Sequence, residues 1–312
     1  MHPIGDFQRD IVLTPDPEVA GRSSLEMSSA WNVFYTFGGM TMAVALRAAC
    51  DHIERDDLKP LTVNAVFCSP IGPGPVQADV TTLRAGKSAS QVSVDLHQGD
   101  AAGPAGSGNV GTPALRMLVT FAQRFETHME YDGITFPADV RPPDECPVRP
   151  APAEGSRAGN PFPDINFDHQ TDWRPALAGF TWEEGPAEGA PLEPRFAAWF
   201  RLLKEPRLAD GSIDPISYCV PADMLGAAVA RRMGPIAHGQ PFFVLSLEIN
   251  LQFFATTDSP WMLQNVVSQH AGDGYAYGTT ELWDGNRRFV GFATQRARLR
   301  PFKAGEAFGP TR

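Results

Sequence analysis

In the first half of the chain, the pattern of hydrophobic and polar positions predicts a helix followed by several strands. Gly38 and Gly39 open an Ala-rich pattern of helical spacing that reaches about Ile53. Alternating segments typical of half-buried strands follow at residues 61–68, 75–84, 88–97 and 114–124. Because Gly and Pro clusters separate these segments, the pattern predicts one helix followed by strands joined by turns.

The second half repeats this order. Asp223 lies at the start of another Ala-rich helical pattern, which ends before Gly234. Strand-like segments follow at residues 243–254, 261–270, 274–283 and 288–300. The last two are separated by Asp284 and Gly285, a pair typical of a two-residue hairpin turn.

The spacing of the two halves agrees as well as the order. Gly39 precedes Thr62 by 23 residues, and Asp223 precedes Ser246 by the same 23. One helix and several long antiparallel strands pack economically when the curved sheet wraps its apolar face around the helix. The sequence therefore predicts an α+β double hotdog, with two antiparallel sheets that each wrap around a central helix.

A Pro-rich segment separates the halves. Twelve of the 29 prolines fall between residues 125 and 194. Proline can neither donate to a strand ladder nor sit within a helix, so irregular or extended chain is expected there. The expected division is an N-terminal hotdog at 1–125, a Pro-rich linker at 126–190 and a C-terminal hotdog at 191–312.

Composition narrows the class of protein. Of 312 residues, 43% are hydrophobic and 20% charged, a composition that disfavours disorder, and the net charge of −10 disfavours nucleic-acid binding. The start of the chain lacks a basic region followed by an apolar one, and charged residues interrupt the apolar runs well short of a membrane span. Four cysteines, without any C-x-x-C pair, fit a reducing cytoplasm. We expect a cytoplasmic protein with no membrane or nucleic-acid partner.

Common catalytic signatures do not explain the chain. Residues 106–111 (GSGNVG) match the dinucleotide fingerprint, but no strand closely precedes them and Pro113 stands where a helix should begin. Neither G-x-S-x-G nor H-E-x-x-H occurs, and the seven histidines never pair at ligand spacing. We therefore expect neither a cofactor nor a metal.

Three polar residues remain of interest. Gln295 lies on the apolar face of the last strand, where a buried amide needs hydrogen-bond partners. It either belongs to a functional site or forms hydrogen bonds with otherwise unpaired backbone groups. Asp223, at a helix start, is either a structural cap or a carboxylate that orients or deprotonates water. Ser246 alternates with the polar set, which by itself predicts a solvated position.

Several motifs resemble the acyl-CoA thioesterase II family, whose members are double-hotdog proteins. In the first half, residues 37–39 (FGG) and 83–88 (LRAGKS) are similar to the family's start of the first helix and its first strand pair. In the second half, residues 246–248 (SLE) resemble a Thr/Ser-Leu-Asp strand, and residues 293–295 (ATQ) resemble the terminal strand that carries a Gln.

The resemblance implies an activity and a site. Asp223, Ser246 and Gln295 correspond to the family's catalytic group, which positions water to hydrolyse acyl-CoA to a carboxylic acid and free CoA. The chain departs from the family after the hydroxyl residue, where Glu248 and Ile249 stand in place of Asp-His. Because strand edges in such folds pair with another copy, a homo-oligomer is also expected.

Two other functions stay open. The missing Asp-His motivates a non-catalytic acyl-CoA or lipid-binding protein. A hotdog hydratase acting on enoyl-CoA would need an acid/base pair, for which Asp164 and His169 in the Pro-rich segment are the candidates. Release of free thiol from a panel of acyl-CoAs distinguishes hydrolysis from both.

Overall fold

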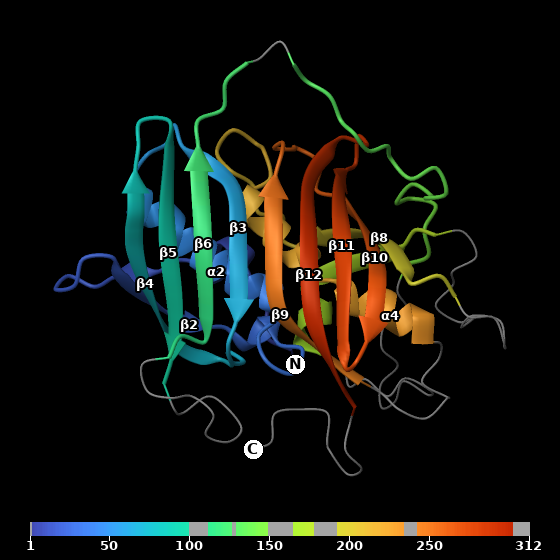
Figure 1. Ribbon diagram of the computed structural model, residues 1–312, viewed down its shortest axis with the longest axis horizontal. Coiled ribbons are helices and arrows are strands. Elements are labelled where there is room, and N and C mark those ends of the chain that lie inside the picture. The colour runs from blue at the N-terminus through green and yellow to red at the C-terminus, as the bar shows by residue number, and fades with distance from the viewer. Residues whose placement is uncertain are drawn as a thin grey trace.

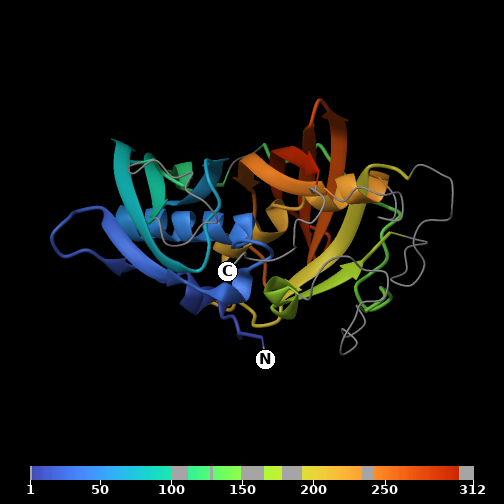
Figure 2. The ribbon, with the colours of Figure 1, turned by 90° about the horizontal axis from the view of Figure 1, so that it is seen from below.

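The computed structural model describes residues 2–99, 112–126, 129–148, 165–177, 192–233 and 242–301. Within them, the strands form one curved antiparallel sheet with helices behind it (Figure 1). Seen from below, the sheet curls around the helices, which lie on its concave side (Figure 2). The fingerprint-like residues 106–111 lie outside the described residues.

The first half contains the predicted helix and strands, each strand within two residues of its expected bounds. Its elements are α1 (Phe7–Asp10), β1 (Thr14–Pro15), β2 (Arg22–Met27), η1 (Ser29–Trp31), α2 (Gly38–Ile53), β3 (Lys59–Phe67), β4 (Gly74–Ala85), β5 (Ala89–Gln98) and β6 (Leu115–Ala122). The short N-terminal elements, β1 and β2 among them, were not predicted. Helix α2 is the central helix, and its small alanines let the sheet approach closely on several sides.

The second half has the predicted strands and a divided helix. Its elements are η2 (Asn166–His169), β7 (Thr171–Pro175), β8 (Arg195–Leu202), η3 (Pro215–Tyr218), α3 (Cys219–Ala222), α4 (Leu225–Met233), β9 (Phe242–Phe253), β10 (Met262–Gly272), β11 (Tyr275–Asp284) and β12 (Phe289–Pro301). The two-residue turn predicted at Asp284 is wrong, because four residues separate β11 from β12. The tight turn instead joins β10 to β11 at Asp273 and Gly274, both with positive φ.

In the described parts of the chain, a single sheet of 12 strands replaces the two separate sheets that we expected. The strand order is β1-β2-β4-β5-β6-β3-β9-β12-β11-β10-β8-β7. The halves meet where β3 pairs antiparallel with β9, from Thr62 opposite Gln252 to Val66 opposite Glu248. Each strand would otherwise present an edge of unpaired N–H and C=O groups, and the pairing satisfies both edges within one chain.

The alternation of apolar and polar residues does not predict strand β8, because both of its faces are covered. Phe196 and Ala198 point to the inner core, whereas Ala197 and Trp199 pack in an outer cluster that includes Val140. A strand buried on both sides lacks the alternation that identifies a half-buried one.

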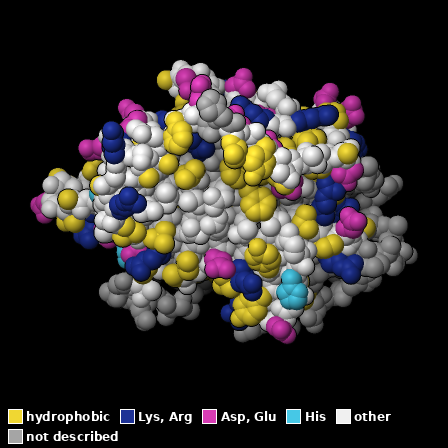
Figure 3. Space-filling view, turned by 45° about the horizontal axis from the view of Figure 1, so that its top comes forward, with side chains coloured by type: hydrophobic (Ala, Val, Ile, Leu, Met, Phe, Trp, Pro, Cys, Tyr) yellow, Lys and Arg dark blue, Asp and Glu magenta, His cyan; other side chains and the backbone are white. Residues whose placement is uncertain are grey.

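The outer face is more open over the first half. Val66 of β3 and Leu118 of β6 are 48% and 46% exposed. Apolar side chains are visible at several places near the middle of the molecule in the space-filling view (Figure 3). Among the described residues, no helix is long and apolar enough to cross a membrane.

Candidate active site

Asp223 lies at a break between two helices. The pattern predicts one helix from this residue, but α3 ends at Ala222 and α4 begins at Leu225. Asp223 itself has φ −96° and ψ 58°, which is outside the helical region. The break directs a carboxylate into the interior, where Asp223 is only 9% exposed.

Ser246 reaches the same place through a β-bulge. Glu248 pairs with Arg296 and Ser246 pairs with Ala297, so Leu247 has no partner on β12. One extra residue reverses the alternation of β9, and Ser246 then shares the inner face of the buried Ala297. The solvated position that the periodicity predicts for Ser246 is therefore wrong.

Gln295 points inward, as the alternation of the last strand predicts, and is 3% exposed. Its Oε1 accepts a hydrogen bond from the N–H of Leu225 at 3.0 Å. Its Nε2 donates to Asp223 Oδ1 at 2.6 Å and to Ser246 Oγ at 2.8 Å. One amide thus connects β12, β9 and the start of α4.

The Asp223 carboxylate receives hydrogen bonds on both oxygens. Oδ1 accepts from Ser246 Oγ at 2.7 Å as well as from Gln295. Oδ2 accepts from the backbone N–H of Gly39 at 3.0 Å. Burial raises the pKa of Asp223 from 3.8 to about 6, although the hydrogen bonds from Ser246, Gln295 and Gly39 favour the anion and oppose that rise.

The sequence gives no side-chain signal for the donor at Gly39, because the donor is its backbone N–H. It lies at the N-terminal end of α2, where backbone N–H groups and the helix dipole favour a negative charge. A Cβ on Gly38 would lie 2.3 Å from Asp223 Oδ2, and one on Gly39 would lie 2.4 Å from the carbonyl oxygen of Cys219. Two consecutive glycines are the signal that the helices approach this closely.

Of the other candidate pair, only His169 is among the described residues. Asp164 lies outside them, and the ring of His169 stacks on that of His2 at 3.7 Å. Among the described residues, no three His, Cys, Asp or Glu side chains are placed to hold a metal ion. The site therefore consists of one carboxylate with its hydroxyl, amide and backbone donors.

The chain resembles known proteins over both halves. Residues 27–122 match the family model described as the acyl-CoA thioesterase N-terminal domain, and residues 143–299 match that of the C-terminal domain. A search of curated proteins finds no match.

Solved structures resemble nearly the whole chain. A conserved protein with a hot dog fold from Alicyclobacillus acidocaldarius is 18% identical, with a TM-score of 0.71, covering 94% of this chain and 97% of its own. The acyl-CoA thioesterase II TesB2 from Mycobacterium marinum is 18% identical, with a TM-score of 0.67 and coverages of 96% and 100%. At these identities the likeness establishes a hotdog-type fold.

Proposed function

The chain belongs to the acyl-CoA thioesterase family, and on that premise we propose that it hydrolyses an acyl-CoA to a carboxylic acid and free CoA at Asp223, Ser246 and Gln295. The observation that carries this proposal is the convergence of the three side chains. They come from the α3–α4 break and from two strands, yet all three join through hydrogen bonds of 2.6–2.8 Å.

Asp223 is the proposed general base. Its Oδ1 already accepts two hydrogen bonds, whereas Oδ2 accepts one, from Gly39, and so retains a lone pair for a water proton. The water oxygen would form a bond to the thioester carbon as its proton moves to Asp223. Collapse of the tetrahedral intermediate breaks the C–S bond, and the proton passes from Asp223 to the departing thiolate of CoA.

Ser246 and Gln295 are the proposed positioning residues. Ser246 donates to Asp223 and accepts from Gln295, so its hydroxyl is held from both sides. This arrangement fixes the carboxylate before a substrate arrives, and preorganised groups avoid reorganisation during the reaction. A thioester is an activated acyl group, so a positioned water and a stabilised oxyanion suffice without a covalent nucleophile.

The oxyanion donor is proposed to be the backbone N–H of Gly38. Within the described part of the chain this N–H donates no hydrogen bond, and it lies at the start of the 16-residue helix α2. Its neighbour Gly39 already donates to Asp223. A thioester carbonyl held here would lie beside both the base and the positive end of the helix.

Hydrolysis of a panel of acyl-CoAs, followed by detection of free CoA thiol, tests the proposal. The expected result is thiol release that depends on Asp223 and needs no added metal. Acyl-CoA binding without thiol release would instead support the non-catalytic binding protein. Hydration of an enoyl-CoA without thiol release would support the hydratase.

We propose the finer architecture on the same basis. The two curved parts of the sheet correspond to two hotdogs, with α2 behind one and α4 behind the other (Figure 1). Residues 1–125, 126–190 and 191–312 remain the proposed division. A homo-oligomer remains a prediction, supported by the exposed apolar side chains of Val66 and Leu118 on the outer face. A cytoplasmic location also remains a prediction, supported by four free cysteines.

A further inference from the structure

Gln264 of β10 is buried without a hydrogen-bond partner. It is 0% exposed, and neither its amide nitrogen nor its amide oxygen has a partner within the part of the chain that the structure describes. Its cross-strand neighbours are Ala198 on β8 and Leu282 on β11, both fully buried and apolar. A buried amide without partners is costly, so this position needs an explanation.

Trp173 of β7 has a second such group in the same layer. Its indole Nε1 is buried and has no partner among the described residues. The ring packs on the cluster formed by Phe196, Ala198, Met224, Ala228 and Val266, with its centroid 6.0 Å from that of Phe196. Because Ala198 directly neighbours Gln264, the orphaned indole and amide border the same apolar layer.

This layer begins at the proposed active site. Met224 directly follows Asp223, and its side chain belongs to the cluster that contains Ala198 and Val266. Gly278 of β11 pairs with Gln295 on one side and with Ser268 on the other. Gln264 lies four residues from Ser268, so it is about 13 Å along the sheet and about 10 Å across it from Gln295.

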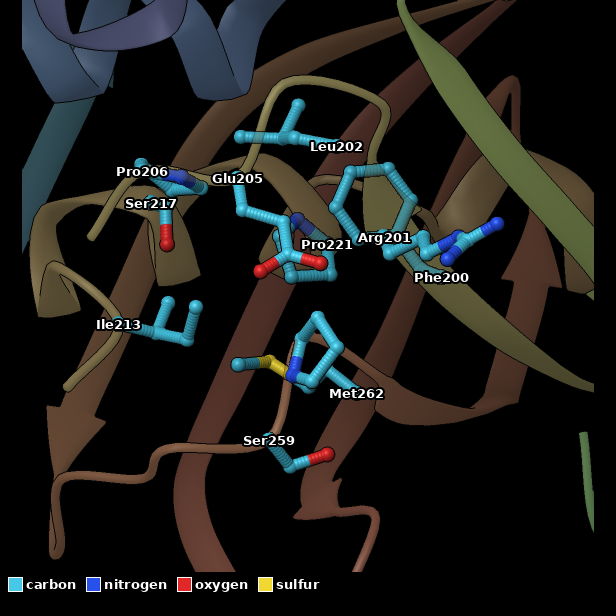
Figure 4. A pocket seen from close by; sticks show the side chains of 11 residues that line it. Phe200, Arg201, Leu202, Glu205, Pro206, Ile213, Ser217, Pro221, Ser259 and Met262 are labelled. Carbon is cyan, nitrogen blue, oxygen red and sulfur yellow. The ribbon is translucent and has the colours of Figure 1, made fainter. Parts of the chain in front are cut away.

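A small pocket and adaptable side chains lie next along the strands from Gln264. The pocket, of about 20 Å³, is lined by Met262 and Phe200, the next inward-facing residues of β10 and β8, and by Pro221 of α3, whereas Gln264 and Trp173 do not line it (Figure 4). Its volume suits a small group rather than a whole chain. Flexible thioether side chains at Met262 and Met224 can move to admit a longer occupant.

We propose that the acyl group of the substrate carries a hydrogen-bonding group at its distal end, which binds Gln264 and Trp173. This inference rests on the proposed thioesterase function. A terminal hydroxyl fits best, because it can donate to Gln264 Oε1 and accept from Gln264 Nε2 or Trp173 Nε1. The substrate class is therefore a medium-chain ω-oxygenated acyl-CoA rather than a plain alkyl one.

Paired substrates test the preference. We would measure kcat/KM for ω-hydroxydodecanoyl-CoA and dodecanoyl-CoA, with octanoyl and hexadecanoyl pairs as length controls. The expected ratio favours the hydroxylated substrate at least tenfold at one length. Gln264→Met removes the amide at similar size and should abolish the ratio. Gln252→Met is the matched control, since Gln252 bonds Thr62 and Asn250 instead, and should leave it unchanged.

The outcomes separate this inference from the proposed function. Equal kcat/KM for every pair, or an unchanged ratio in Gln264→Met, overturns the inference while hydrolysis stands. If Gln264→Met does not fold, Trp173→Phe supplies the same comparison. Calorimetric binding of free ω-hydroxydodecanoate and dodecanoate needs no turnover. A tenfold preference there without thiol release would retain the distal polar site and reject the thioesterase; no preference would reject the site.

Discussion

The backbone N–H of Gly39 lies 3.0 Å from Asp223 Oδ2 and donates a hydrogen bond to it. Gly39 lies in the first turn of the central helix of the first half, whereas Asp223 follows α3 in the second. The two halves therefore contribute to one carboxylate environment. The halves also meet where β3 pairs with β9.

Replacement of Asp223 by Asn should lower kcat by a hundredfold or more. The amide keeps the size of the side chain but cannot accept a proton from water. Thiol release from a saturating acyl-CoA gives the measurement. Asp51→Asn is the matched control, because Asp51 pairs with Arg47 in a partly exposed ion pair and should leave kcat unchanged. Full turnover by Asp223→Asn would remove Asp223 from the role of base.

Turnover should depend on a single ionisation near pH 6. Burial raises the pKa of Asp223 to about 6, and only the anion can act as base. The expected kcat/KM is constant above pH 7 and falls about tenfold per unit below pH 6. A pH–rate profile with a slowly reacting acyl-CoA measures it. A profile that is flat between pH 5 and pH 8 would contradict the assignment.

The free energy of unfolding should respond to the ionisation of Asp223 in the opposite direction to turnover, falling as the pH rises. Because the pKa of Asp223 is higher in the folded protein than the ordinary 3.8, the folded state binds more protons between these values. The contribution of Asp223 to stability is therefore present below pH 4 and lost as pH rises through 6. Asp223→Asn should gain about 1–3 kcal/mol relative to the wild type between pH 4 and pH 7. Urea unfolding at both pH values tests this sign.

Alanine at Gly39 should destabilise the protein. Within a helix Gly→Ala normally stabilises by up to about 1 kcal/mol, but here the new Cβ would lie 2.4 Å from the carbonyl oxygen of Cys219. Such overpacking costs about 1–3 kcal/mol, so the net change should be a loss. Gly226→Ala in α4 is the matched control, since its Cβ would meet Val244 at 3.4 Å and should stabilise. Thermal unfolding compares the two.

Turnover should require the hydroxyl group of Ser246, which a threonine at the same position can also supply. Ser246→Ala removes the donor to Asp223 Oδ1 and should lower kcat about ten- to a hundredfold. Ser246→Thr retains the hydroxyl and should keep kcat within a few-fold of the wild type. Steady-state kinetics with one acyl-CoA tests the pair. Equal losses in both variants would indicate a packing role rather than a hydrogen-bonding one.

Several features could not be predicted because they depend on contacts between distant segments. The bulge at Leu247 appears only when β9 pairs with β12, and it reverses the face on which Ser246 lies. The helix break at Asp223 follows the same logic, since partners on α2, β9 and β12 satisfy its carboxylate. Strand β8 does not alternate between apolar and polar residues, because Trp199 on its outer face is also buried in a hydrophobic cluster.

Spacing and alternation along the chain predicted the helix at residues 38–53, eight strands and the inward direction of Gln295 on β12, because both are local properties. The remaining features arise from the tertiary structure. It joined the halves through β3 and β9 and placed Ser246 and Gln295 on one carboxylate, since edge pairing and burial of a charge depend on residues far apart in the chain.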